Sequence, residues 1–174
     1  MRFSIISLSL ALFQFCPAGE PEPSAKEDSL YCRKTIVLAK TLDVYEGLPH
    51  PSKDRTLFER EIKREDVTKI WNYSFYTPGV SATNADKLKR ILSDPETLEI
   101  REGPKRCLEF HPDYDLAWKE QEKTNHALIC FGCSEIVFFD GKASFVYDLN
   151  VRANSRLKEL LSSHAKKRPS GLVK

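Results

Sequence analysis

The residues best suited to chemistry are cysteines and histidines in the C-terminal half of the chain. Cys107 and His111 form a C-x3-H pair, and Cys130 and Cys133 form a C-x2-C pair that begins after eighteen further residues. Zinc is commonly bound by four thiolate and imidazole donors in a tetrahedron, and a C-x2-C turn supplies two of them together. The spacing therefore allows a structural zinc site made of these four residues, and it indicates no other cofactor.

Disulfide bonds are the preferred state of the same sulfurs. Cys32, Cys107, Cys130 and Cys133 remain once the signal peptide described below is removed. An even number of cysteines in an exported protein favours pairing, and oxidation competes with metal binding for the thiols. Free or partly paired thiols are a third state, and the sequence alone leaves all three open.

The segment Cys130-Phe131-Gly132-Cys133 also matches the C-x-x-C of thiol–disulfide enzymes. Such enzymes place the cysteines at the N-terminus of a helix, which lowers the thiol pKa. Residues 134–139 read SEIVFF, a pattern typical of a strand, so the helix would be missing. A thiol–disulfide redox protein is therefore the alternative function, behind a non-catalytic binding or structural module.

His111, Asp113 and Asp115 could form an acid–base set, but HPDYD is also typical of a turn whose side chains cap the backbone, which is the preferred interpretation. His50 is expected in an exposed loop, and His126 is expected to have a structural role at the start of a strand. None of the common hydrolase, zinc-protease, P-loop or dinucleotide-binding patterns is present. Whether the chain is an enzyme stays undecided.

The N-terminus is typical of a secretory signal peptide over residues 1–18. Arg2 precedes an apolar run that ends at Phe15 and is too short to span a membrane, and cleavage is expected after Ala18. A lipid anchor on Cys16 is disfavoured because the bulky Phe15 precedes it. We therefore expect an exported protein, periplasmic, in the cell envelope or secreted, with no transmembrane segment after cleavage.

Composition predicts one globular domain. The 174 residues are 41% hydrophobic and 30% charged, with a net charge of +2. Acidic and basic residues are mixed, so there is no concentrated basic face for nucleic acid. We expect a flexible lead over 19–30, a single domain over 31–165 and a basic, disordered tail over 166–174.

Periodicity predicts an α+β fold, an antiparallel sheet with a C-terminal helix and one or two further helices packed on it. The strands are expected at Thr35–Leu42, Val67–Tyr76, Thr97–Arg101, His126–Phe131, Glu135–Phe139 and Ala143–Leu149, with a turn at Asp140-Gly141.

Helices are expected at two places. Asn84 is a candidate cap for a helix that carries Leu88 and Leu92. The terminal helix has one apolar face, made of Ala153, Leu157, Leu160, Leu161 and His164. The charged segment Thr56–Glu65 fits either a weak helix or an edge strand.

Three segments together resemble a known group of proteins: LDVYEGLPHP (42–51), CLEFHPDYDLAW (107–118) and LICFGCSEIVFF (128–139). They are similar to small exported bacterial proteins of unknown function that combine YEGLPH, CxxFHPDY and CFxC segments. The resemblance implies a single exported domain and singles out Cys107, His111, Cys130 and Cys133. It supplies neither substrate nor cofactor. Such relatives often carry another cysteine before the tryptophan, where this chain has Leu116.

Overall fold

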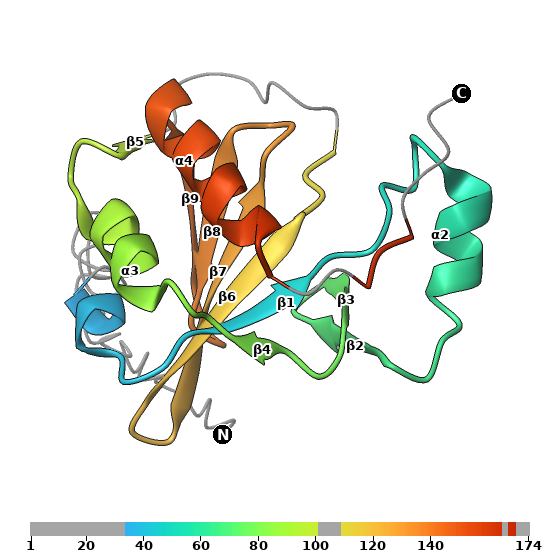
Figure 1. The fold of residues 1–174 in the computed structure, drawn as a ribbon, viewed down its shortest axis with the longest axis horizontal. Coiled ribbons are helices and arrows are strands. Elements are labelled where there is room, and N and C mark those ends of the chain that lie inside the picture. Colours follow the sequence, from blue (N-terminus) through green and yellow to red (C-terminus); the bar gives the residue numbers. More distant parts are fainter. Residues whose placement is uncertain (1–33, 101–108, 165–166, 170–174) are drawn as a thin grey trace, which may run out of the picture.

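The computed structural model describes residues 34–100, 109–164 and 167–169 (Figure 1). The predicted signal peptide and flexible lead, as well as Cys16, Cys32 and Cys107, lie outside these residues. One domain is built on a seven-stranded antiparallel sheet in the order β4-β1-β6-β7-β8-β9-β5, which confirms the predicted α+β class. The strands are β1 (Asp43–Glu46), β4 (Val80–Ser81), β5 (Leu98–Ile100), β6 (Tyr114–Glu120), β7 (Lys123–Cys130), β8 (Glu135–Phe139) and β9 (Ser144–Leu149).

One face of the sheet carries the main core. Helices α3 (Ala85–Ser93) and α4 (Val151–Ser162) cover it together with the helical residues 34–38. Along β7, Ala127 and Ile129 point to this core, while the alternate residues Leu128 and Cys130 point to the other face. The central strands are therefore buried on both sides. Among the described residues, no helix is long and apolar enough to cross a membrane.

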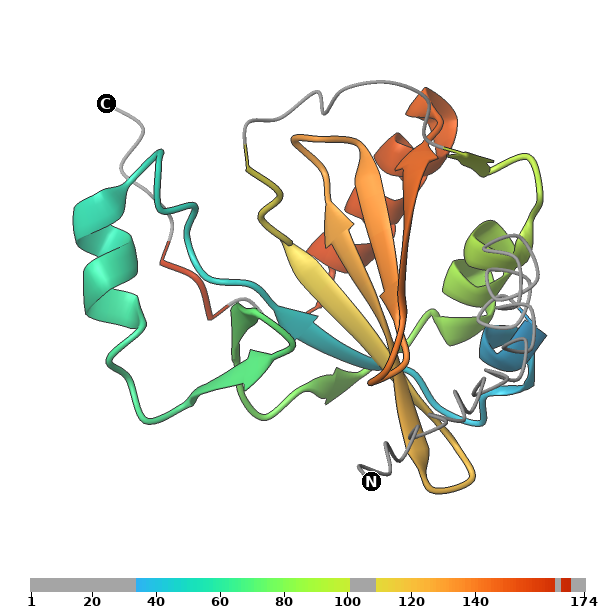
Figure 2. The ribbon, with the colours of Figure 1, turned by 180° about the vertical axis from the view of Figure 1, so that it is seen from behind.

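The opposite face carries a second, smaller core. It is covered by the hairpin of β2 (Val67–Ile70) and β3 (Tyr73–Tyr76), from which Phe75 packs against Leu128 and Val137. Helix α2 (Arg55–Glu61) follows the YEGLPH segment and lies beyond the hairpin, at one end of the molecule (Figure 2). We call residues 48–77, which contain α2, β2 and β3, the small lobe.

The predicted strand at Thr35–Leu42 is wrong. Residues 34–38 are helical, and the strand begins only at Asp43. Ile36 in this short helix and Ala39 directly after it are buried, three positions apart, whereas Leu38 is 79% exposed. An apolar run of this length has no decisive period, and its burial decides its structure.

Two further predictions differ from the structure. The expected strand Val67–Tyr76 is a hairpin that turns at Trp71, whose φ is +54° although no glycine marks the turn. The turn predicted at HPDYD ends earlier than expected, because Tyr114 and Asp115 already belong to β6, a seven-residue strand that was not predicted. By contrast, β5, β7, β8 and β9 lie where strands were expected.

Both well-defined predicted helices are present. Asn84 occupies the N-cap position of α3, as predicted, but its side chain makes no capping hydrogen bond. Its side-chain amide donates instead to Leu160 O (3.1 Å) and so connects α3 to α4. Asn150 caps α4, because its side chain accepts from the backbone N–H of Ala153 (2.8 Å). His164 is buried at the end of the apolar face of α4, as expected.

The Asp140-Gly141 turn supports a pH prediction. Burial would raise the pKa of Asp140, but the N–H of Ala143, the ammonium of Lys123 and the N–H of Lys142 outweigh it and hold the pKa at about 2. A depressed pKa stabilises the fold above the unfolded value of 3.8, and this stability is lost as the pH falls through about 2.

We expect Asp140→Asn to cost about 1–2 kcal/mol at pH 7 and to flatten the stability profile between about pH 4 and 2. Urea unfolding across this range measures both effects. The exposed neighbour Glu122, changed to Gln, is the control. An equal loss in both variants would contradict the role given to Asp140.

Candidate functional site

The YEGLPH and FHPDY segments meet beside the end of β1. The backbone N–H of Gly47 donates to Asp113 O (2.8 Å), and His111 Nε2 lies 2.8 Å from Leu48 O. Since a carbonyl only accepts, this contact places the His111 proton on Nε2. The rings of His50 and His111 are 4.7 Å apart between centroids. Burial lowers the pKa of His111, which favours the neutral ring.

The CFGC segment contacts the YEGLPH and FHPDY segments through hydrogen bonds of Asp113. The backbone N–H of Asp113 donates to Ile129 O (2.7 Å), and its Oδ2 accepts from the N–H of Phe131 (2.9 Å). All three segments of the resemblance therefore converge, although more than 60 residues separate the first from the second along the chain. We call this meeting of residues 46–50, 109–115 and 129–133 the junction.

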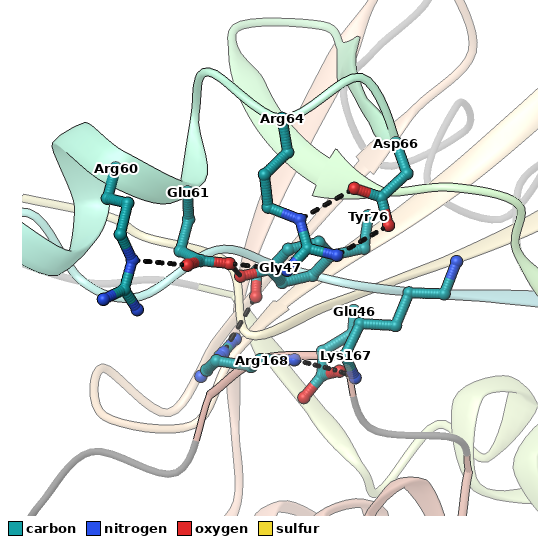
Figure 3. Close-up of polar contacts among 9 residues, drawn as sticks. All are labelled: Glu46, Gly47, Arg60, Glu61, Arg64, Asp66, Tyr76, Lys167 and Arg168. Atoms are coloured by element: carbon teal, nitrogen blue, oxygen red, sulfur yellow. Dashed lines mark hydrogen bonds and ion pairs between the residues drawn. The ribbon is translucent and has the colours of Figure 1, made fainter.

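Two residues of the predicted disordered tail complete the junction. Arg168 Nε donates to Gly47 O (2.8 Å), and its two terminal nitrogens donate to Asp113 Oδ1 (3.2 Å) and Asp113 O (3.1 Å). Glu46, which is 8% exposed, accepts the backbone N–H groups of Lys167 and Arg168 (Figure 3). Residues 167–169 thus do not match the prediction of a disordered tail; the other residues of 166–174 lie outside the described part of the chain.

The thiol of Cys130 is free and lies 4% exposed in the second core, among Phe75, Phe110 and Val137. The backbone N–H of Cys133 is 3.3 Å from its sulfur, and the N–H of His111 also bonds to it. Burial nevertheless raises the pKa of Cys130. A reactive cysteine needs the opposite, a lowered pKa and access to solvent.

Cys133 takes part in a disulfide bond, and its partner lies outside the described residues. The Cys133 sulfur is 3.9 Å from Glu109 O, two residues after Cys107 in the sequence. A sulfur held in a disulfide has no thiolate to give to a metal. In the described part of the chain, no group of three or more His, Cys, Asp or Glu side chains is placed to hold a metal ion.

The expected acid–base set does not form as one cluster. Asp113 bonds to the backbone and Arg168, whereas Asp115 Oδ2 lies 2.8 Å from His126 Nδ1. Asp115 is fully buried, and burial raises its pKa; the His126 side chain is 15% exposed. The pairing of His126 with Asp115 was not predicted, because it depends on β6 lying beside β7.

A second polar cluster ties the small lobe together. Glu61 is 3% exposed and accepts from Tyr76 OH (2.9 Å), Arg60 Nε (3.1 Å) and Arg64 Nη1 (3.1 Å) (Figure 3). Burial would raise the pKa of Glu61, but these three donors outweigh it and lower the pKa. Arg64 also donates two hydrogen bonds to the carboxylate of Asp66 (2.8 and 2.9 Å). The cluster explains how a polar helix such as α2 is held on the β2–β3 hairpin.

Comparisons with known proteins found no relative of this chain. No protein-family model matches the chain, and no curated protein or solved structure is significantly similar to it. Its function is therefore inferred from the geometry of its own residues.

Proposed function

We propose that this chain is an exported, non-catalytic binding or structural module whose Cys/His segments form a disulfide-stabilised junction. The observation that carries the proposal is how the polar groups of the junction are used. The His111 Nε2, both carboxylate oxygens of Asp113 and the backbone groups of Gly47 all bond within the junction or to Arg168. Polar groups that already bond to the protein itself hold its segments in place and are not available to bind a substrate.

We propose Cys107 as the disulfide partner of Cys133. A disulfide requires the two Cα atoms to lie within about 7 Å. The contact between the Cys133 sulfur and Glu109 O brings the chain two residues from Cys107 to this sulfur. Cys130 is a free thiol and so is not the partner. The bond would join the FHPDY and CFGC segments beside the hydrogen bonds of Asp113.

The redox alternative finds less support in the geometry. The CFGC segment leads into β8 at Glu135, so no helix dipole is available to stabilise a thiolate. Cys130 is also buried among aromatic and aliphatic side chains. Structural zinc at Cys107, His111, Cys130 and Cys133 would require all three thiols reduced. It is a separate outcome of the experiment that tests the disulfide.

Peptide mapping of the purified chain, alkylated without reductant, tests the proposal together with elemental analysis for zinc. We expect a Cys107–Cys133 linked peptide, an alkylated Cys130 once the chain is denatured, and no stoichiometric zinc. Cys107→Ser should expose Cys133 to alkylation and lower the free energy of unfolding by about 2–4 kcal/mol.

Cys130→Ser is the matched control, because it removes a sulfur from the same segment and should leave the Cys107–Cys133 peptide intact. One zinc ion per chain with every thiol reduced would replace the disulfide by the metal site. A bond between Cys130 and Cys133 that exchanges readily with glutathione would favour redox chemistry instead.

A further inference from the structure

We propose that the cavity between α3 and α4 binds a small ligand that carries a phosphate or sulfate group. The cavity has a volume of about 420 Å³ and lies between the two helices and the loop that precedes β5. In Figure 1 these elements stand next to one another on the helical side of the sheet. None of the junction residues lines the cavity, so this site is independent of the disulfide and goes beyond the function proposed above.

The walls of the cavity are strongly basic. Lys87 and Arg90 come from α3, and Arg152 and Arg156 come from α4. None of these four cations forms an ion pair with any of the described residues; only Arg90 is engaged, through Nε to the backbone oxygen of Asp86 (3.3 Å). An anion between the helices would therefore meet cations from both walls that are still available to bind it.

Two carboxylates also line the cavity but do not neutralise it. Asp94 Oδ1 accepts the backbone N–H of Glu96 (2.9 Å), which holds its carboxylate in the loop. Four cations face two acids around the cavity. In addition, Arg152 and Arg156 are like charges at i and i+4, an unfavourable arrangement that a bound anion would relieve.

The cavity is held in shape by buried groups. Ala153 and Thr97 are 5% exposed and form its floor. Asn150 joins the two sides, because its amide donates to Glu96 O (2.6 Å) while its oxygen caps α4 at Ala153. The first turn of α4 contains no acidic residue that would offset the positive end of the helix, which therefore adds to the field of the arginines.

The chemistry of the walls selects the ligand class. Guanidinium groups present paired N–H donors that match the oxygens of phosphate and sulfate. The volume lies in the range typical of sites for small organic ligands. The partly apolar floor, with Ile91 and Ala153, favours an organic ester over the free inorganic ion.

Isothermal titration of the full mature chain with phenyl phosphate and phenyl sulfate tests the site, with inorganic phosphate and phenol as the other probes. We expect saturable binding of both esters, weaker binding of inorganic phosphate and no binding of phenol. Arg152→Gln/Arg156→Gln should weaken ester binding about tenfold or more, since the loss of one charge-assisted contact alone corresponds to a factor of about ten.

The control removes the same charge elsewhere. Lys63→Gln/Lys69→Gln changes two exposed lysines of the small lobe and should leave binding unchanged. A second variant, Lys87→Gln/Arg90→Gln, alters the opposite wall of the cavity and should reproduce the tenfold loss even if the first variant folds poorly. Equal loss in the small-lobe control, or the absence of saturable ester binding to the unmodified chain, would overturn the proposal.

Discussion

Replacement of Gly47 by alanine is expected to lower the free energy of unfolding by about 3 kcal/mol, because the residue has no space for a side chain. A Cβ atom at this position would lie 2.1 Å from Pro112 O and 3.2 Å from Asp113 O. Both are backbone atoms, so the clash cannot be relieved by a change of rotamer. The junction would have to open, with loss of the Gly47–Asp113 hydrogen bond.

Gly132→Ala is the matched control, since it adds the same methyl group to another junction segment. The nearest atom to its Cβ would be Lys53 Nζ at 4.0 Å, the end of a flexible side chain. We expect a change within about 0.5 kcal/mol in urea unfolding. Similar effects of the two substitutions would show that the close approach of YEGLPH to FHPDY does not constrain the fold.

Glu61→Ala is expected to destabilise the protein by about 2–3 kcal/mol, because it removes the acceptor of three hydrogen bonds and leaves a buried donor unsatisfied. The substitution leaves the buried hydroxyl of Tyr76 without its acceptor and removes one of the two acidic partners of Arg64. Thermal unfolding, or proteolysis of the small lobe, measures the effect.

Glu59→Ala provides the comparison within the same helix. Glu59 pairs with Arg55, but the two side chains are 56% and 84% exposed, and such surface pairs contribute at most about 0.5 kcal/mol. Tyr76→Phe should give an intermediate loss of about 1–2 kcal/mol, because it removes the hydroxyl alone. If Glu59→Ala were as damaging as Glu61→Ala, helix propensity rather than the buried cluster would hold α2.

The sequence was sufficient for the fold class and for elements with a clear period. The Asp140-Gly141 turn and the apolar face of α4 were predicted because their residue types have few alternatives. Strand β6 was missed because Gln121, with a φ of +53°, makes the turn after it where glycine would be the usual signal. Without β6, the pairing of Asp115 with His126 could not be foreseen.

The candidate site was only partly predictable for a related reason. Resemblance singled out the three segments but not what their polar atoms do, since that depends on contacts between distant residues. Arg168 illustrates this: its basic surroundings and the neighbouring Pro169 indicated a frayed tail, yet it donates to Gly47 and Asp113. Local composition carries no information about an acceptor more than 50 residues away.

The contacts of Arg168 also bear on when the chain folds. Strand β1 pairs with β4 and β6 rather than with a strand adjacent in sequence. The backbone N–H groups of residues 167 and 168 then donate to Glu46 at the end of β1. Pairings between distant residues slow folding, because the chain must lose loop entropy before they form. These contacts cannot be made until residue 168 has been synthesised. The end of β1 is therefore held in place only when almost all of the described chain is present.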